Sequence, residues 1–307
     1  MRDTSASPPP GALPASRLKY GISVPPHGDY AAPKLLAALA REAEDAGWDG
    51  FFLWDHLLFM RGFDRPVVDP WISLAAVATA TQRIRFGTMV TPLARRRPWK
   101  VAKEAVTLDH LSDGRFILGV GLGYPRDSEF EDFGEDGDER VRADKLDEAL
   151  DIIVGLWSGR PFRYKGQHFQ IAECTFLPEP VQRPRIPIWV AGYWPNRRPF
   201  RRAARWDGVL PGRLSLERRK RWTPTMIPPQ TYGDIVSYVQ EHRTATTPYD
   251  FALGGYTNGD GGDADQERVA AYADLGVTWW FENLHGFRGS LDQTRERIRL
   301  GPPRLSP

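Results

Sequence analysis

Short apolar runs alternate with longer amphipathic segments from Leu18 onwards. Apolar runs without alternation predict strands that are covered on both faces, as in a parallel sheet. The segments between them carry apolar residues three and four positions apart, which predicts helices with one buried face. The predicted strands are 18–24, 50–53, 84–90, 116–120, 188–191, 208–210, 251–255 and 278–282. The predicted helices are 34–46, 70–81, 100–111, 140–157, 197–205, 232–243, 265–275 and one that begins at Ser290.

Strand and helix units repeated in this way predict one α/β domain over residues 18–307, a (β/α)8 TIM barrel. The proline-rich segment 158–187 predicts an insertion after the fourth helix, and the polar segment 213–230 predicts an irregular loop after the sixth strand. Two helix starts have the residue spacing of a capping box, Thr231 with Asp234 and Ser290 with Gln293.

The composition of the chain limits the classes of protein to which it can belong. The 307 residues are 41% apolar and carry a net charge of +2, so the chain can bury a barrel core and a nucleic-acid surface is not expected. The basic run 95–97 is interpreted as a solvated loop that could hold an anionic tail. The single cysteine, Cys174, excludes an internal disulfide and favours the cytoplasm. No apolar run has the length of a membrane span, and residues 1–17 predict a flexible N-terminal extension.

The block from Thr107 to Gly123 predicts a helix end, a turn, a buried strand and a strand exit with two glycines. Gly121 and Gly123 lack a Cβ, so the backbone at this exit can approach a ligand or turn sharply. In such barrels the active site lies at the carboxyl ends of the strands. The residues at those exits are mostly aromatic, small or uncharged, which favours a flat, largely apolar ligand. They include His27, Trp54, Asp55, His56, Thr91, Gly121, Gly123, Tyr124, Gly192, Tyr193, Trp194, Pro211, Tyr256, Thr257, Glu282, Asn283 and His285.

His56 is the sharpest candidate for chemistry. It follows Asp55 at the end of the second strand, and an imidazole can carry or donate a proton near neutral pH. The alternative is a buried histidine with satisfied hydrogen bonds. The aromatic residues Trp54, Tyr193 and Trp194 are likewise either packing residues or a stacking wall. The residues alone leave both choices open.

Other barrel chemistries lack the residues that they require. A glycosidase needs facing carboxylates, for which only Asp55 and Glu282 are available as an unproven pair. The histidines show no metal-ligand spacing, and no lysine follows a strand as a Schiff-base aldolase would need. The glycines at 119, 121 and 123 do not have the spacing of a dinucleotide fingerprint.

The segment 97–123, RPWKVAKEAVTLDHLSDGRFILGVGLG, resembles the bacterial-luciferase-like family of flavin- and F420-dependent oxidoreductases. The features R-x-P, at residues 96–98, and A-K, T-L-D-x-L-S-x-G-R and L-G-V-G-x-G within the segment match the pattern of that family. The segments WDGFFLWDHLL, FGTMVTPL, PIWVAG and RRAARWDGVLP are similar too, in the same order. The resemblance covers residues 18–300.

The resemblance implies a cofactor ring over the strand ends. His56 with Asp55 would face the ring, and residues 88–90 would form a bulge that often holds a non-proline cis peptide in the family. The cofactor-binding residues implied in this way are Asp55, His56, Thr88, Met89, Val90, Gly121, Gly123, Gly192 and Tyr193. Tyr124 stands where some F420-dependent members have an acidic proton donor. The Asp-His pair resembles the F420 branch more than the FMN branch.

The implied function is that of an oxidoreductase with His56 as the catalytic residue. Reduced F420 would give hydride transfer to a carbonyl or unsaturated substrate, and reduced FMN would give oxygen-dependent monooxygenation. A separate reductase could supply the reduced cofactor, and the resemblance implies a homodimer. A barrel that binds flavin without turnover is the non-enzyme alternative, and a barrel hydrolase without cofactor affinity is a third. The sequence does not indicate the substrate.

Overall fold

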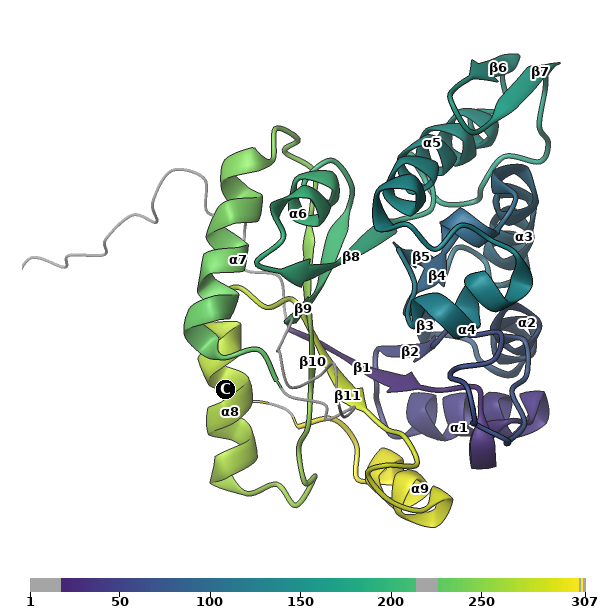
Figure 1. Cartoon of the computed structure of the whole chain (residues 1–307). Coiled ribbons are helices and arrows are strands. Elements are labelled where there is room, and N and C mark those ends of the chain that lie inside the picture. Colours follow the sequence, from purple (N-terminus) through teal and green to yellow (C-terminus); the bar gives the residue numbers. More distant parts are fainter. Residues whose placement is uncertain (1–17, 214–225, 304, 306–307) are drawn as a thin grey trace, which may run out of the picture.

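The computed structural model describes residues 18–213, 226–303 and 305, which form a closed barrel of parallel strands (Figure 1). The strands of the barrel are β1 (Lys19–Val24), β2 (Gly50–Leu53), β3 (Arg85–Thr88), β5 (Phe116–Gly121), β8 (Ile188–Trp194), β9 (Gly208–Arg213), β10 (Asp250–Gly255) and β11 (Trp279–Asn283). Because β1 pairs with both β2 and β11, and β3 pairs with β5, the ring has no open edge. The predicted TIM barrel is therefore confirmed.

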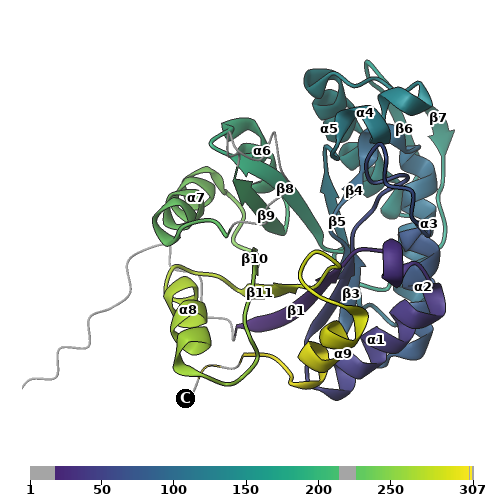
Figure 2. The same ribbon diagram turned by 60° about the horizontal axis from the view of Figure 1, so that its bottom comes forward.

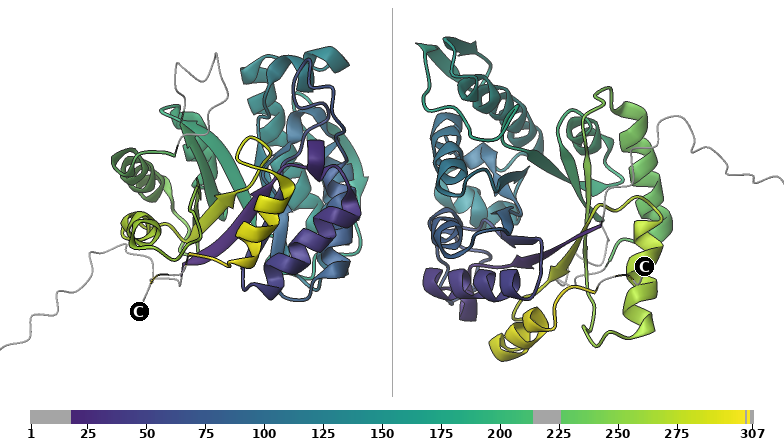
Figure 3. Two further views of the ribbon diagram at one scale, coloured as in Figure 1. Left: turned by 90° about the horizontal axis from the view of Figure 1, so that it is seen from below. Right: turned by 180° about the vertical axis from the view of Figure 1, so that it is seen from behind.

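Helices surround the strands, as Figures 2 and 3 show from other sides. They are α1 (Pro33–Asp45), α2 (Pro70–Ala80), α3 (Pro98–Leu111), α5 (Glu139–Trp157), α6 (Arg197–Ala203), α7 (Pro229–His242), α8 (Asp263–Ala273) and α9 (Leu291–Arg299). Short turns of helix lie in the connections: η1 (Gly28–Tyr30), η2 (Leu93–Arg95), α4 (Arg126–Glu129) and η3 (Glu131–Phe133). The predicted extension 1–17 and most of the predicted loop 213–230 lie outside the described residues.

Several helices begin where local chemistry allows it. A proline stands in the first turn of α1, α2, α3 and α7, where its missing N–H costs no hydrogen bond. Ser290 and Gln293 form the predicted capping box of α9. The box predicted for Thr231 and Asp234 is wrong, because α7 already begins at Pro229.

The segment 158–187 is an insertion, as predicted. It contains β6 (Phe162–Lys165) and β7 (Gln170–Cys174), which pair as an antiparallel hairpin. The hairpin lies beyond the end of α5, at the top of Figure 1. Glu148 of α5 accepts the backbone N–H groups of residues 167–169, so one carboxylate fastens the hairpin to the helix.

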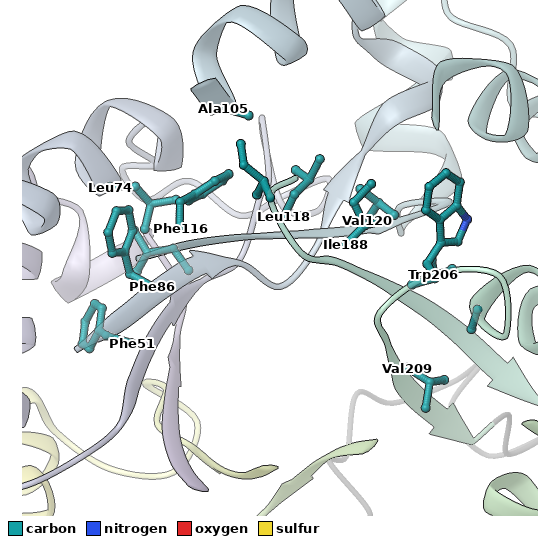
Figure 4. Close-up of a cluster of buried hydrophobic side chains, with 14 of the residues drawn as sticks. Phe51, Leu74, Phe86, Ala105, Phe116, Leu118, Val120, Ile188, Trp206 and Val209 are labelled. Atoms are coloured by element: carbon teal, nitrogen blue, oxygen red, sulfur yellow. The ribbon is translucent and has the colours of Figure 1, made fainter. Parts of the chain in front are cut away.

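Two apolar layers follow from the alternation of side chains along each strand. The outer layer lies between strands and helices, and Figure 4 shows Phe86 and Phe116 of neighbouring strands beside Leu74 of α2. The inner layer fills the barrel with rings, among which Phe52 stacks on Trp189 at 5.4 Å between centroids. The interior is therefore a packed core, and a ligand has to bind above it, at the strand ends.

The predicted strand 84–90 divides in two. The chain leaves β3 at Thr88 and pairs with β5 again at the two-residue strand β4 (Thr91–Pro92). The peptide bond Met89–Val90 between them is cis. The bulge that the resemblance implied is therefore confirmed, together with its non-proline cis peptide.

Candidate active site at the carboxyl end of the barrel

Three histidines surround Trp54 at the carboxyl end of the barrel. His27 follows β1, His56 follows β2 and His285 follows β11, and these three strands are neighbours. Their ring centroids lie 5.8, 6.1 and 5.9 Å from that of Trp54, respectively. The Trp54 Nε1 donates a hydrogen bond of 2.8 Å to Ser23 Oγ of β1. The barrel thus brings together candidates that are far apart in the sequence.

Phenylalanine rings cover the same group. The Phe59 centroid lies 4.2 Å from that of His27 and 5.1 Å from that of His56. The ring centroids of Phe287 and His285 lie 5.9 Å apart, and 59% of the surface of Phe287 is exposed. We call these histidines, Trp54 and the two phenylalanines the histidine cluster. Its apolar surface suits a flat organic ligand.

Two of the histidines are neutral at pH 7. Burial, followed by the charges of His56 and Arg65, lowers the pKa of His27 to about 4. Burial and the charge of Arg288 lower the pKa of His285 to about 4 as well. Both side chains are buried, with 4% and 1% of their surface exposed. The cluster therefore presents uncharged imidazoles beside His56.

These buried histidines predict a loss of stability in mild acid. In the unfolded chain a histidine takes up its proton near pH 6.5, whereas His27 and His285 in the folded chain do so only near pH 4. The unfolded state therefore binds more protons as the pH falls between these values, and the free energy of unfolding should drop by roughly 3 kcal/mol for each group. Urea unfolding between pH 7 and pH 4 measures this drop. His27→Gln should make it smaller, and an equal drop in that variant would contradict the assignment.

Asp55 turns away from the cluster into a group of charged and polar side chains. Its carboxylate accepts hydrogen bonds from Trp71 Nε1 at 3.0 Å and Thr91 Oγ1 at 2.9 Å. Arg95 and Arg96 each donate to it at 2.9 Å. The interpretation of 95–97 as a solvated loop is wrong for Arg95, whose side chain is only 3% exposed. Asp55 therefore holds neighbouring loops in place, and its predicted contact with a cofactor stays a prediction.

His56 lies beside a second carboxylate, which the sequence did not single out. Its Nδ1 is 3.3 Å from Glu129 Oε1, in a geometry that falls short of a regular hydrogen bond. Glu129 also accepts hydrogen bonds from the backbone N–H groups of residues 57–59 and from Arg95 Nη1. The Glu129 side chain is fully buried, whereas 16% of the His56 side chain is exposed.

Glu129 is ionised at neutral pH. Burial alone would raise its pKa, but the contact with His56, the charge of Arg95 and the N–H of Leu57 lower that pKa to about 2. Sequence reasoning missed this residue because it lies in an acidic segment, 127–136, without helical or strand periodicity. The apolar Phe130 next to it, which is fully buried, is the one local signal that the segment turns inward there.

The bulge at the end of β3 consists of one buried residue and two half-buried residues. Thr88 is buried, and its Oγ1 donates to the carbonyl of Gly119 at 2.8 Å. Met89 and Val90 are half-buried. A Cβ at Gly121 would lie 2.8 Å from Val90 Cγ2, so this glycine lets the bulge approach β5. The structure brings these residues together, and their contacts with a cofactor stay predictions.

Of the remaining predicted residues, Gly123 follows β5, whereas Gly192 and Tyr193 lie in the carboxyl-terminal part of β8. Gly123 has a φ of +81°, a conformation that favours glycine, and a Cβ there would lie 2.8 Å from Pro92. A Cβ at Gly192 would lie 2.5 Å from Pro199, so this glycine admits α6. Tyr193 is 42% exposed. Local packing explains both glycines, and roles of these three residues in binding a cofactor stay predictions.

The two carboxylates considered as a possible glycosidase pair, Asp55 and Glu282, both form ion pairs with arginines. Glu282 accepts hydrogen bonds from Thr257 N at 2.8 Å and Thr257 Oγ1 at 2.6 Å, and it forms ion pairs with Arg288 and Arg297. Asp55 is held by its arginines, as described above. Both carboxylates are therefore bound by side chains of the protein itself.

The part of the chain that the structure describes contains no group of three or more His, Cys, Asp or Glu side chains arranged to hold a metal ion. Within the same residues, no helix has both the length and the apolar character that crossing a membrane requires.

Comparison with known proteins shows to which family the chain belongs. Residues 18–227 match the model of the luciferase-like monooxygenases. The chain belongs to this family. The match includes β1 to β9, and with them the histidine cluster residues His27 and His56 and the carboxylate of Glu129.

Curated relatives of this luciferase-like protein include F420-dependent enzymes. An F420-dependent hydroxymycolic acid dehydrogenase from Mycobacterium tuberculosis is 35% identical over 194 residues, which cover 63% of this chain and 52% of the relative. An F420-dependent glucose-6-phosphate dehydrogenase from Beutenbergia cavernae is 34% identical over 229 residues, 71% of this chain and 62% of the relative. The chain thus spans between half and two thirds of the length of these relatives.

Solved structures share the fold of the luciferase-like chain. An F420-dependent secondary alcohol dehydrogenase in complex with an F420-acetone adduct has a TM-score of 0.73 at 16% identity, over 92% of this chain and 97% of that one. A type II Baeyer-Villiger monooxygenase from Pseudomonas putida, in complex with FMN, has a TM-score of 0.62 at 17% identity, over 85% and 72%. At these identities the likeness shows the fold alone.

Proposed function

We propose that the chain is an oxidoreductase that binds reduced F420 or reduced FMN across the carboxyl end of the barrel and acts on a small organic substrate. The observation that carries this proposal is the position of His56. It is the partly exposed imidazole of the histidine cluster, it has an ionised carboxylate beside Nδ1, and apolar rings surround it. Membership of the luciferase-like family supports the same conclusion.

The residues present fit a flat ring system. Met89 and Val90 offer a half-buried apolar surface, and Gly121 adds no side chain beside it. The Nε2 of His27 is buried and has no hydrogen-bond partner among the described residues, so it could bond a polar group of a ligand. In the proposed complex Met89 and Val90 lie under the ring. Gly123, Gly192 and Tyr193 lie along its tail.

Within this proposal the protein positions the reactants and manages one proton. A bound reduced F420 supplies a hydride, whereas a bound reduced FMN supplies electrons for the activation of oxygen. Hydride transfer to a carbonyl carbon would leave a negative charge on the carbonyl oxygen, and His56 would donate a proton to that oxygen from Nε2, the nitrogen that does not face Glu129. His27 and His285 stay neutral, and the rings of the cluster exclude water from the reacting atoms.

We favour F420 over FMN as the cofactor. Three relatives that are 32% to 35% identical to this chain are named as F420-dependent enzymes. The Asp55–His56 pair resembles the same branch. FMN remains the alternative because solved structures of this fold include an enzyme in complex with FMN.

Parallel titrations test the proposal. The chain has 11 tryptophans, and Trp54 lies in the histidine cluster, so a bound ring should quench the intrinsic fluorescence. We expect reduced F420 to bind at least about tenfold more tightly than reduced FMN, a difference of about 1.4 kcal/mol. Affinity for neither cofactor would refute the proposal. Binding without oxidation of the reduced cofactor, tested over a panel of ketones, enones and alcohols, would instead indicate the non-catalytic flavin-binding barrel.

The proposed partners follow from the same reasoning. A small organic molecule would be the substrate, and a separate reductase would return the cofactor to its reduced form. Assembly as a homodimer and a location in the cytoplasm stay predictions, as does a single domain over residues 18–307.

A further inference from the structure

We propose that Glu129 is a positioning residue for His56: it holds the proton of the imidazole on Nδ1 and so leaves Nε2 for the substrate. This inference rests on the proposed role of His56, and it adds a residue that carries out no proton transfer itself. It concerns the protonation of one ring, which can be measured without a substrate.

The contact between the two side chains has a defined direction. Glu129 Oε1 lies 3.3 Å from Nδ1, which is buried, and no other side chain of the described residues bonds to this nitrogen. An ionised carboxylate favours a proton on the nitrogen that faces it, as in the carboxylate–histidine pairs of other sites. The other nitrogen, Nε2, does not face Glu129, and 16% of the His56 side chain is exposed.

The carboxylate itself is fixed from several sides. Three successive backbone N–H groups, those of residues 57–59, donate to Glu129 at 2.8 to 3.1 Å. Arg95 Nη1 donates to Oε2 at 2.7 Å, and Arg95 in turn is paired with Asp55. These bonds hold α4 against the segment that follows β2, and they keep Oε1 of Glu129 beside the imidazole of His56. The arrangement is therefore built for a fixed negative charge at this point.

Two other carboxylates of the chain, those of Glu44 and Glu148, bind successive backbone N–H groups as Glu129 does. Glu44 accepts the N–H groups of residues 82–84, and Glu148 accepts those of residues 167–169. Both fasten a loop in the same way, and neither has a histidine side chain or a buried arginine as a partner among the described residues. Fastening a loop therefore does not require the contact with His56, which is the feature particular to Glu129.

The first experiment reads the tautomer of His56 directly. Nitrogen-15 NMR of the wild-type protein with labelled histidine, assigned through a His56→Ala sample, should show the Nδ1–H tautomer in the neutral ring. Glu129→Gln keeps the volume and an acceptor oxygen for the backbone but removes the charge. It should shift the ring towards the Nε2–H tautomer. A wild-type ring with its proton on Nε2, or an unchanged tautomer in Glu129→Gln, would overturn the proposal.

The second experiment asks whether the contact matters for turnover. Glu129→Gln should lower kcat about tenfold or more, with less change in KM. Glu148→Gln is the matched control, because it removes an equal charge from an equal loop contact far from the cluster, and its kcat should stay at the wild-type value. In a His56→Ala background Glu129→Gln should cause no further loss, because its effect passes through the imidazole.

The outcomes separate this inference from the proposed function. Independent, multiplicative losses in the double variant would overturn the positioning role of Glu129 while His56 keeps its own. An active His56→Ala enzyme would instead remove the proposed role of His56 in turnover, and the NMR result would still decide whether Glu129 sets the tautomer. Thermal melting of Glu129→Gln, compared with that of Glu148→Gln, shows whether any loss of turnover comes from a damaged fold.

Discussion

His56→Ala should lower kcat/KM by about 10²- to 10⁴-fold, the usual contribution of a positioned general acid or base. The expectation follows from three properties of the side chain. It is partly exposed at the carboxyl end of the barrel, an ionised carboxylate lies 3.3 Å from its Nδ1, and its neighbours are apolar rings. The affinity for the reduced cofactor, followed by tryptophan fluorescence, should change much less, because the loss concerns a proton transfer.

A matched control separates this effect from the loss of any histidine. His110 lies in the last turn of α3 on the outer surface, where its Nε2 contacts the carbonyl of Glu179 at 2.7 Å. His110→Ala should keep wild-type kcat/KM. If the two variants were equally active, the proton transfer would have to be assigned to another group. Tyr124, which is 56% exposed at the exit of β5, would be the first to test.

The fold was predictable because the information lies in local patterns. Each barrel strand is a short apolar run and each outer helix has its own buried face, so the units can be counted without knowledge of their contacts. The end of β3 shows the limit of this method. Residues 84–90 are predicted as one strand, yet β3 stops at Thr88, because the chain passes through the bulge before it pairs with β5 again.

The candidate site was predictable only in part. His27, His56 and His285 lie two or three residues after the ends of their strands, so the rule about strand ends finds them. Glu129 and Arg95 do not, since Glu129 acts on residues about 70 positions away and Arg95 on Asp55 some 40 positions away. The same limit applies to Asp55, because its sequence position next to His56 says nothing about the arginines that turn its side chain away.

Glu282→Ala should be the most destabilising of the substitutions considered. Glu282 is fully buried in β11, and it joins the exit of β10, through Thr257, to Arg288 and to Arg297 of α9. Removal of one partner from such a buried network leaves uncompensated charge, which typically costs about 3–5 kcal/mol. The urea midpoint at pH 7 should fall accordingly. The slope of the transition should stay unchanged, because the folded state buries the same surface.

An exposed ion pair provides the comparison for Glu282. Asp45 of α1 pairs with Arg41 one turn away, and the side chains are 65% and 57% exposed. Because water screens such a pair, Asp45→Ala should leave the urea midpoint almost unchanged. Equal midpoints for Asp45→Ala and Glu282→Ala would mean that solvent or rearranged side chains compensate the arginines. In that case the network around Glu282 would have to serve the geometry of the strand exits, where Thr257 and His285 lie, rather than the stability of the barrel.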